Sequence, residues 1–287
     1  YLHSFPTRRS SDLIGRWSLL DGERPLLRSF AVGARFLTGE IFRSDEPMTA
    51  GVSLAMQPVS QSPPAYAVRL INRSGAPIRL DRILLVAGAA LDLGGSWLDW
   101  RFYCHGWQAW SPSWCVGLGE GRQPAMSPEY TRGLASPELC RLSYERLHRP
   151  IAVKPEELGS HFFGAVHAPG HGTLVLGFLR QDRQFGQVIL RRPECRDELP
   201  VLIAQTDLEG LALPDGAELA GEPLGFWFGP DLQPLHEFAA AVAPPGGIGP
   251  GESPLGWCSW YYYFTGISEG AVLANLEILA GDPELTP

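Results

Sequence analysis

Residues 65–87, AYAVRLINRSGAPIRLDRILLVA, carry the pattern that decides the fold. Apolar side chains alternate over residues 65–71, turn-forming residues gather at 72–77 (NRSGAP), and residues 78–87 continue apolar on one side. A period of two is typical of a half-buried strand, and Asn, Ser, Gly and Pro together favour a turn. We therefore predict two strands that pair as a hairpin.

The same pattern of short strand-like runs separated by turn residues extends over most of the chain, from residue 16 to residue 229. Further short apolar or alternating runs lie at residues 173–180, 185–190, 199–206 and 218–228, and turn clusters separate them. The 287 residues include 33 Gly and 26 Pro without a tripeptide period, which indicates many turns and argues against an all-helical fold. We predict a mainly β fold, a large antiparallel β-sandwich (supersandwich).

Composition and charge exclude several classes of protein. A hydrophobic content of 45% supports a large core and excludes intrinsic disorder, while a net charge of −8 offers no basic stripe for nucleic acid. No run approaches the roughly 18 apolar residues of a spanning helix, so we expect no membrane segment. The five cysteines are an odd number at wide spacings, which favours reduced thiols and a cytoplasmic location. Scattered histidines without CxxC or HExxH motifs predict no metal. We also expect no cofactor.

The character of the sequence changes near residue 244. Asp231 offers an N-cap for a helix that closes the sandwich, and residues 244–251 (PPGGIGPG) have the composition of a linker. Residues 255–260 then predict a short strand, residues 261–267 a loop, and Ser268 the N-cap of a helix. This helix carries Val272, Leu276 and Leu279 on one stripe, with Gly281 beyond its end. A lone unit of this kind cannot bury both faces of its strand, so we expect it to open a repeated β/α domain.

Two clusters of aromatic residues are candidates for binding. The first is HGWQAWSPSW at residues 105–114, where Gly and Pro disfavour a continuous strand, and the second is GWCSWYYYF at residues 256–264. Indole rings can pack against the apolar C–H face of a sugar while polar neighbours take its hydroxyls. The alternative is that these rings fill the core or a seam between domains. Alternation along the expected strand places Trp257 and Ser259 on one side and Cys258 and Trp260 on the other.

Both clusters resemble segments of one family. The string GWCSWYYYFTGISEGAVLANLEIL at 256–279 resembles the first β/α unit of the catalytic barrel in glycoside hydrolase family 36, the α-galactosidase and raffinose-synthase group. HGWQAWSPSW is similar to a segment of the N-terminal β-sandwich of that family. The order of sandwich, linker and barrel start agrees, so the resemblance extends from about residue 16 to the end. Ala109 is a departure, because the family often has a small hydroxyl residue there.

The resemblance implies a sandwich followed by the first β/α unit of a truncated TIM (β/α)8 barrel. It also implies retaining hydrolysis of an α-galactoside oligosaccharide by an aspartate nucleophile and an aspartate acid/base. In the family both aspartates belong to later barrel strands, which we expect beyond Pro287, so no acidic residue of this chain is assigned as a catalyst. Residue by residue, the resemblance assigns Trp257, Trp260 and Tyr261 to the wall of the galactose subsite. It assigns Trp107 and Trp110 to a sandwich loop that touches the same cleft.

The expected organisation has four parts. Residues 1–13 form a non-native tail, because residues 3–13 resemble a translated sequencing adapter, and the alternative is a genuine N-terminal arm. Residues 14–243 form the sandwich with its closing helix, 244–253 the linker and 254–287 the start of the barrel.

Two other functions stay open: a non-catalytic carbohydrate-binding sandwich, and a raffinose-synthase-like galactosyltransferase of the same fold. Assembly of the full-length protein into homo-oligomers also stays open.

Overall fold

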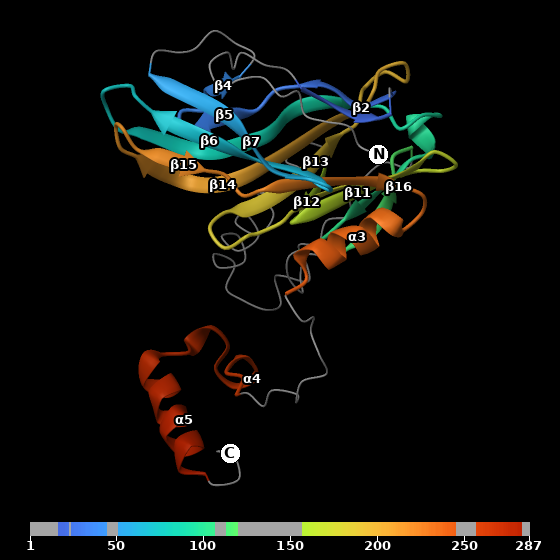
Figure 1. Cartoon of the computed structure of the whole chain (residues 1–287). Coiled ribbons are helices and arrows are strands. Elements are labelled where there is room, and N and C mark those ends of the chain that lie inside the picture. The colour runs from blue at the N-terminus through green and yellow to red at the C-terminus, as the bar shows by residue number, and fades with distance from the viewer. Residues whose placement is uncertain are drawn as a thin grey trace.

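The computed structural model describes residues 17–22, 24–44, 51–106, 113–119, 157–244 and 257–282. Within these ranges the chain is mainly β, with two eight-stranded sheets in which every strand pair is antiparallel (Figure 1). This confirms the expected class of fold and its two antiparallel sheets.

The first sheet has the strand order β1-β2-β7-β14-β13-β10, with β3 beside β7 and β4 beside β3. Its strands are β1 (Trp17–Asp21), β2 (Arg24–Phe30), β3 (Gly33–Phe36), β4 (Ile41–Arg43), β7 (Ile78–Leu91), β10 (Glu157–His161), β13 (Phe185–Arg191) and β14 (Val201–Leu213).

The second sheet has the order β15-β6-β16-β12-β11-β8-β9, with β5 along the other side of β6. Its strands are β5 (Val52–Gln61), β6 (Pro64–Asn72), β8 (Arg101–Cys104), β9 (Trp114–Gly117), β11 (Phe163–Ala168), β12 (Gly172–Phe178), β15 (Glu218–Ala220) and β16 (Leu224–Gly229). The helical elements of the described chain are η1 (Trp97–Asp99), α3 (Gln233–Val242), α4 (Trp260–Tyr263), η2 (Phe264–Gly266) and α5 (Glu269–Gly281).

Large apolar side chains from both sheets form one core. Tyr66 of β6 stacks between Phe30 of the first sheet and Phe226 of the second, with ring centroids 6.2 and 5.7 Å away. Its hydroxyl donates a hydrogen bond to the carbonyl of Leu85, so this buried polar group is satisfied across the two sheets. Burial raises the pKa of the Tyr66 phenol well above its ordinary value, which keeps it a donor.

The predicted hairpin at residues 65–87 is wrong, although both of its strands exist. β6 belongs to the second sheet and β7 to the first, so residues 73–77 carry the chain from one sheet to the other. The amide of buried Asn72 holds this crossing by donating to the carbonyls of Ala76 (2.8 Å) and Leu213 (3.0 Å). β6 pairs with β5, and β7 with β14, along most of their lengths, and these ladders replace a pairing of β6 with β7.

Other expected strands are confirmed with changes at their ends. The runs at 173–180 and 185–190 are β12 and β13, and the run at 199–206 is the first half of the longer β14. The run at 218–228 divides into β15 and β16. Pro223 lies in the break and lacks the N–H that a continuous ladder requires.

Helix α3 covers one face of the second sheet, as the sequence predicts for a closing helix. The ring of Phe238 meets Trp227 of β16 edge to face at 5.2 Å and Phe163 of β11 at 4.9 Å. The predicted N-cap is wrong, because Leu232 occupies that position and Asp231 has a positive φ of 45°. The carbonyl of Asp231 instead accepts a hydrogen bond from the hydroxyl of Thr173 at 2.6 Å.

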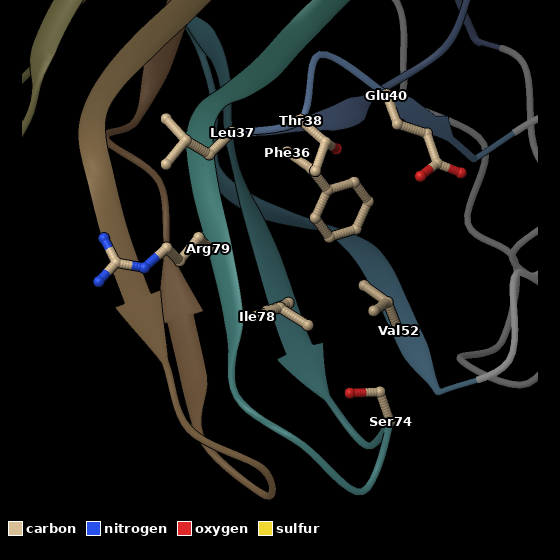
Figure 2. A pocket seen from close by; sticks show the side chains of 8 residues that line it. All are labelled: Phe36, Leu37, Thr38, Glu40, Val52, Ser74, Ile78 and Arg79. Atoms are coloured by element: carbon tan, nitrogen blue, oxygen red, sulfur yellow. The ribbon is translucent and has the colours of Figure 1, made fainter.

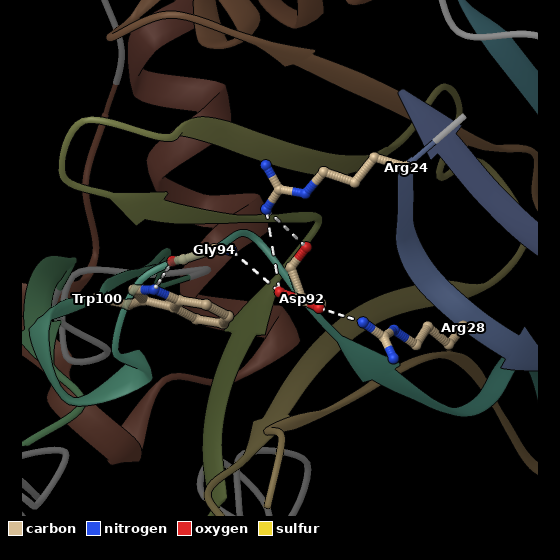
Figure 3. Close-up of polar contacts among 5 residues, drawn as sticks. All are labelled: Arg24, Arg28, Asp92, Gly94 and Trp100. Carbon is tan, nitrogen blue, oxygen red and sulfur yellow. Dashed lines mark hydrogen bonds and ion pairs between the residues drawn. The ribbon is translucent and has the colours of Figure 1, made fainter. Parts of the chain in front are cut away.

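An arginine–aspartate network fastens β2 to the chain that leaves β7 (Figure 3). Asp92 forms an ion pair with Arg28, and its backbone carbonyl accepts from Arg24 at 3.3 Å. The Asp92 carboxylate also accepts from the N–H of Gly94 (3.1 Å), whose carbonyl in turn accepts from the indole of Trp100 (3.0 Å). The network thereby holds buried Trp100 at the edge of the core.

No helix in the described ranges has the length and apolar content needed to cross a membrane.

Candidate functional site

The aromatic segment after the linker is helical where the sequence predicts a strand. Residues 257–259 have no regular structure, and α4 begins at Trp260, so the strand expected at 255–260 is wrong over its described part. The carbonyl of Ser259 accepts from the backbone N–H groups of Tyr262 (3.3 Å) and Tyr263 (2.9 Å). A strand needs a neighbour for its backbone groups, and this local turn satisfies them without one.

The indoles of Trp257 and Trp260 contact different partners. Trp257 is 40% exposed and meets the ring of Tyr263 edge to face at 6.2 Å, while Trp260 is half-buried and meets Phe264 at 5.7 Å. The sides expected from strand alternation no longer apply. The side chain of Tyr261 lies outside the described part of the structure. Its neighbour Tyr262 is 82% exposed, so this segment presents aromatic surface to solvent.

Helix α5 follows the aromatic segment and is bonded to it. Ser268 is its N-cap as predicted, since the hydroxyl accepts from the N–H of Ala271 at 3.2 Å, and Gly281 is its last residue rather than a residue beyond its end. Asn275 donates to the Tyr263 hydroxyl (2.9 Å) and to the Ala271 carbonyl (2.8 Å). The α4 segment and α5 are therefore joined by a specific hydrogen bond.

Apolar side chains occur all round α5, not only on the predicted stripe. Leu273 and Ile278 lie off that stripe and are 51% and 71% exposed, and no residue of the helix is buried. A helix that is apolar on every side is typical of a buried helix in a larger domain.

The tryptophan segment of the sandwich connects two paired strands. Trp107 and Trp110 lie outside the described residues, so their side chains are not placed. At the flanks, Cys104 of β8 pairs with Trp114 of β9, and the N–H of Gly106 donates to the Ser113 hydroxyl at 2.9 Å. β8 ends and β9 begins on either side of residues 107–112, as the expected break in the strand requires.

Two histidines join the sheets beside this segment. The N–H of His161 in β10 donates to the carbonyl of His105 at 2.9 Å, and Nδ1 of His105 lies 3.1 Å from the carbonyl of His161. The N–H of His105 also donates to the Ser160 hydroxyl at 2.7 Å. The His105 ring packs on Phe163 at 4.9 Å, and the His161 ring on Phe185 at 5.0 Å. The residues just before Trp107 are thus held by the first sheet.

The imidazole of His161 is strongly perturbed. Its pKa is lowered to about 4, mainly by burial and then by the nearby His105, while a hydrogen bond with the His105 backbone opposes both effects. The imidazole is therefore neutral at pH 7. Sequence reasoning missed this pair, because a single histidine at the end of an alternating run carries no signal of burial.

Two acidic residues of the described chain, Asp207 and Glu269, have local structural roles. Asp207 of β14 accepts from the N–H of Glu209 at 2.9 Å, and Glu269 lies in the first turn of α5, where a carboxylate is favoured by the helix dipole. Glu120 and Glu129 lie outside the described residues. Among those that are described, no group of three or more His, Cys, Asp and Glu is placed to hold a metal ion.

Within the described residues the candidate site consists of an exposed aromatic segment bonded to an apolar helix, and of the ends of β8 and β9 that flank residues 107–112.

Comparison of the sequence with protein-family models and with curated proteins found no match.

Proposed function

We propose that this chain is the N-terminal part of a retaining glycoside hydrolase that acts on α-galactosides. The two tryptophan-rich motifs support the proposal through their resemblance to glycoside hydrolase family 36. The observation that carries it is the unit at residues 257–282, in which an aromatic turn is bonded to a helix that is apolar on every side. Such a helix needs further structure around it, and the remaining units of a β/α barrel would supply it.

The exposed indole of Trp257 has the role of a sugar platform in this proposal. Its neighbour Tyr263 is fixed by Asn275 and meets the indole edge to face, which leaves indole surface open for the C–H face of galactose. The proposal also assigns Trp260 and Tyr261 to the wall of the subsite, and it assigns Trp107 and Trp110 to substrate binding from the resemblance alone. These residues orient the substrate and exclude water, and they transfer no proton.

Proton transfer and nucleophilic attack belong to two aspartates that the proposal places after Pro287. Retention of configuration requires carboxyl groups about 5 to 5.5 Å apart on opposite sides of the scissile bond. Asp207 and Glu269 are excluded from these roles because one caps a backbone turn and the other stabilises a helix start.

The test is to compare residues 1–287 with the protein encoded by the reading frame extended past Pro287. We expect the extended protein to release the phenol from an aryl α-galactoside and residues 1–287 to show no turnover. Clear turnover by residues 1–287 would contradict the placement of the aspartates. Inactivity of a folded extended protein on α-galactosides would contradict the proposed substrate, and transfer to a sugar acceptor in place of water would assign a transferase.

A further inference from the structure

A cavity of about 540 Å³ opens at one end of the sandwich (Figure 2). Its lining comes from the end of β3 and the turn that follows, from the start of β5, from the connection between β6 and β7, and from the start of β7. The cavity therefore lies between the two sheets. Its volume falls within the range of about 300 to 1,000 Å³ that is typical of small-molecule sites.

The floor of the cavity is apolar. Phe36 and Ile78 pack against the core cluster and are only partly buried, and Val52 beside them is almost fully buried. Figure 2 shows the Phe36 ring and the side chains of Val52 and Ile78 facing the same space. An organic group that enters there would remove apolar surface of both sheets from water.

The rim of the cavity carries two charged side chains, the carboxylate of Glu40 and the guanidinium of Arg79, and they do not form an ion pair with each other. This carboxylate forms no hydrogen bond or ion pair with any residue in the described ranges. The hydroxyl of Ser74 bonds to the Asn72 amide oxygen (2.7 Å) and the Ala76 carbonyl (2.9 Å), and the guanidinium of Arg79 points away from the floor (Figure 2). The rim therefore presents a negative hydrogen-bond acceptor.

We propose that this cavity binds a small organic cation, with its apolar body between the sheets and its ammonium group on Glu40. An ionised carboxylate only accepts hydrogen bonds, and its strongest partner is a charged donor. The net charge of −8 disfavours an anionic ligand, and Arg79, the one cation among the described lining residues, directs its guanidinium away from the floor. A sugar needs several polar partners, whereas this floor is apolar. The site is independent of the proposed hydrolase activity.

The test uses residues 1–287 labelled with ¹⁵N and titrated with 2-phenylethylamine at low salt. We expect saturable shifts of the amides of residues 36–40 and 78–79, and at least about fivefold weaker binding of the uncharged isostere 2-phenylethanol. Glu40→Gln should remove this preference, and Glu237→Gln, an exposed carboxylate on α3, should leave it intact. Higher salt should reduce the preference, because this charge pair is exposed.

A second variant tests the apolar part of the site. Leu37 is 53% exposed on the rim, so Leu37→Ser should keep the fold while weakening the amine and the alcohol equally. The proposal would be overturned by equal affinity for amine and alcohol or by a preference that survives Glu40→Gln. The absence of saturable binding, or tighter binding of methyl α-D-galactoside, would also overturn it.

Discussion

The backbone N–H of His161 donates to the carbonyl of His105 across 2.9 Å, and the Nδ1 atom of His105 returns to within 3.1 Å of the His161 carbonyl. His161 belongs to β10, an edge strand of the first sheet, and His105 follows β8 of the second sheet. This reciprocal contact closes the sandwich at one edge. It lies directly before residue 107, so the end of β8 and the edge strand β10 are held by the same contact.

The low pKa of His161 predicts a loss of stability in mild acid. The unfolded chain binds a proton on this histidine near pH 6.5 and the folded chain only near pH 4, so the unfolded state holds more protons between these values. Stability should therefore fall as the pH drops from 6.5 to 4, by about 3 kcal/mol from this residue, and should lose nothing more from it at lower pH. Urea unfolding of residues 1–287 at a series of pH values measures this slope.

The matched variant His161→Gln separates this effect from the titration of carboxylates. Its side chain is polar and does not titrate, so its unfolding free energy should depend less steeply on pH between 4 and 6.5 than that of the parent chain. Parallel pH profiles for the two proteins would show that His161 does not carry the effect.

Gly177 should not tolerate even a methyl group. A Cβ atom at this position of β12 would lie 2.2 Å from Cε2 of Phe238, the residue that packs α3 on the sheet. We expect Gly177→Ala to lower the free energy of unfolding by about 1 to 3 kcal/mol, as overpacking in a core does. Thermal or urea denaturation measures the loss.

Shortening the opposing ring should relieve this clash. The double variant Gly177→Ala with Phe238→Leu should be less destabilised than the sum of the two single variants, because the added methyl then meets a smaller side chain. Additive losses would mean that α3 does not press on β12 through Phe238.

Sequence patterns predicted the class of fold well because alternation and turn chemistry are local. Strands and their approximate ends follow from short apolar runs such as 185–190, which lies in β13 and is buried almost throughout. The partner of a strand is decided by residues far along the chain. β6 and β7 are joined by a turn that favours a hairpin, and yet Asn72 bonds to Leu213 and the two strands enter different sheets.

The candidate site was predicted in part. The cap at Ser268 followed from the sequence because capping needs only a hydroxyl and an N–H three residues on. The strand at 255–260 did not, because aromatic residues favour strands only when a neighbouring strand pairs with them. The contact between His105 and His161 joins residues 56 positions apart and leaves no local pattern.

Helix α5 should make residues 1–287 associate with themselves. Leu276 and Ile278 are 57% and 71% exposed, and apolar surface of this kind binds other apolar surface in water. Replacing both by Lys should shift sedimentation velocity profiles toward the monomer. A matched Val59→Lys change on β5, where the parent residue is 51% exposed, should leave association unchanged. Equal association of all three proteins would show that α5 is not the contact surface.

Trp257 should matter for binding rather than for folding. In the extended protein, Trp257→Ala should raise KM for an aryl α-galactoside with a smaller change in kcat, because the indole orients the sugar and transfers no proton. Tyr262→Ala is the control, since that side chain is 82% exposed next to the proposed wall. Loss of the folded state in Trp257→Ala would assign the ring to packing instead.

Sequencing of the coding DNA beyond the codon for Pro287 tests most directly whether this chain opens a β/α barrel. We expect a continuing frame with alternating strands and helices, a second strand that carries paired aspartates, and two further aspartates on later strands. A frame that ends near Pro287, or one that continues without such units and aspartates, would contradict this expectation.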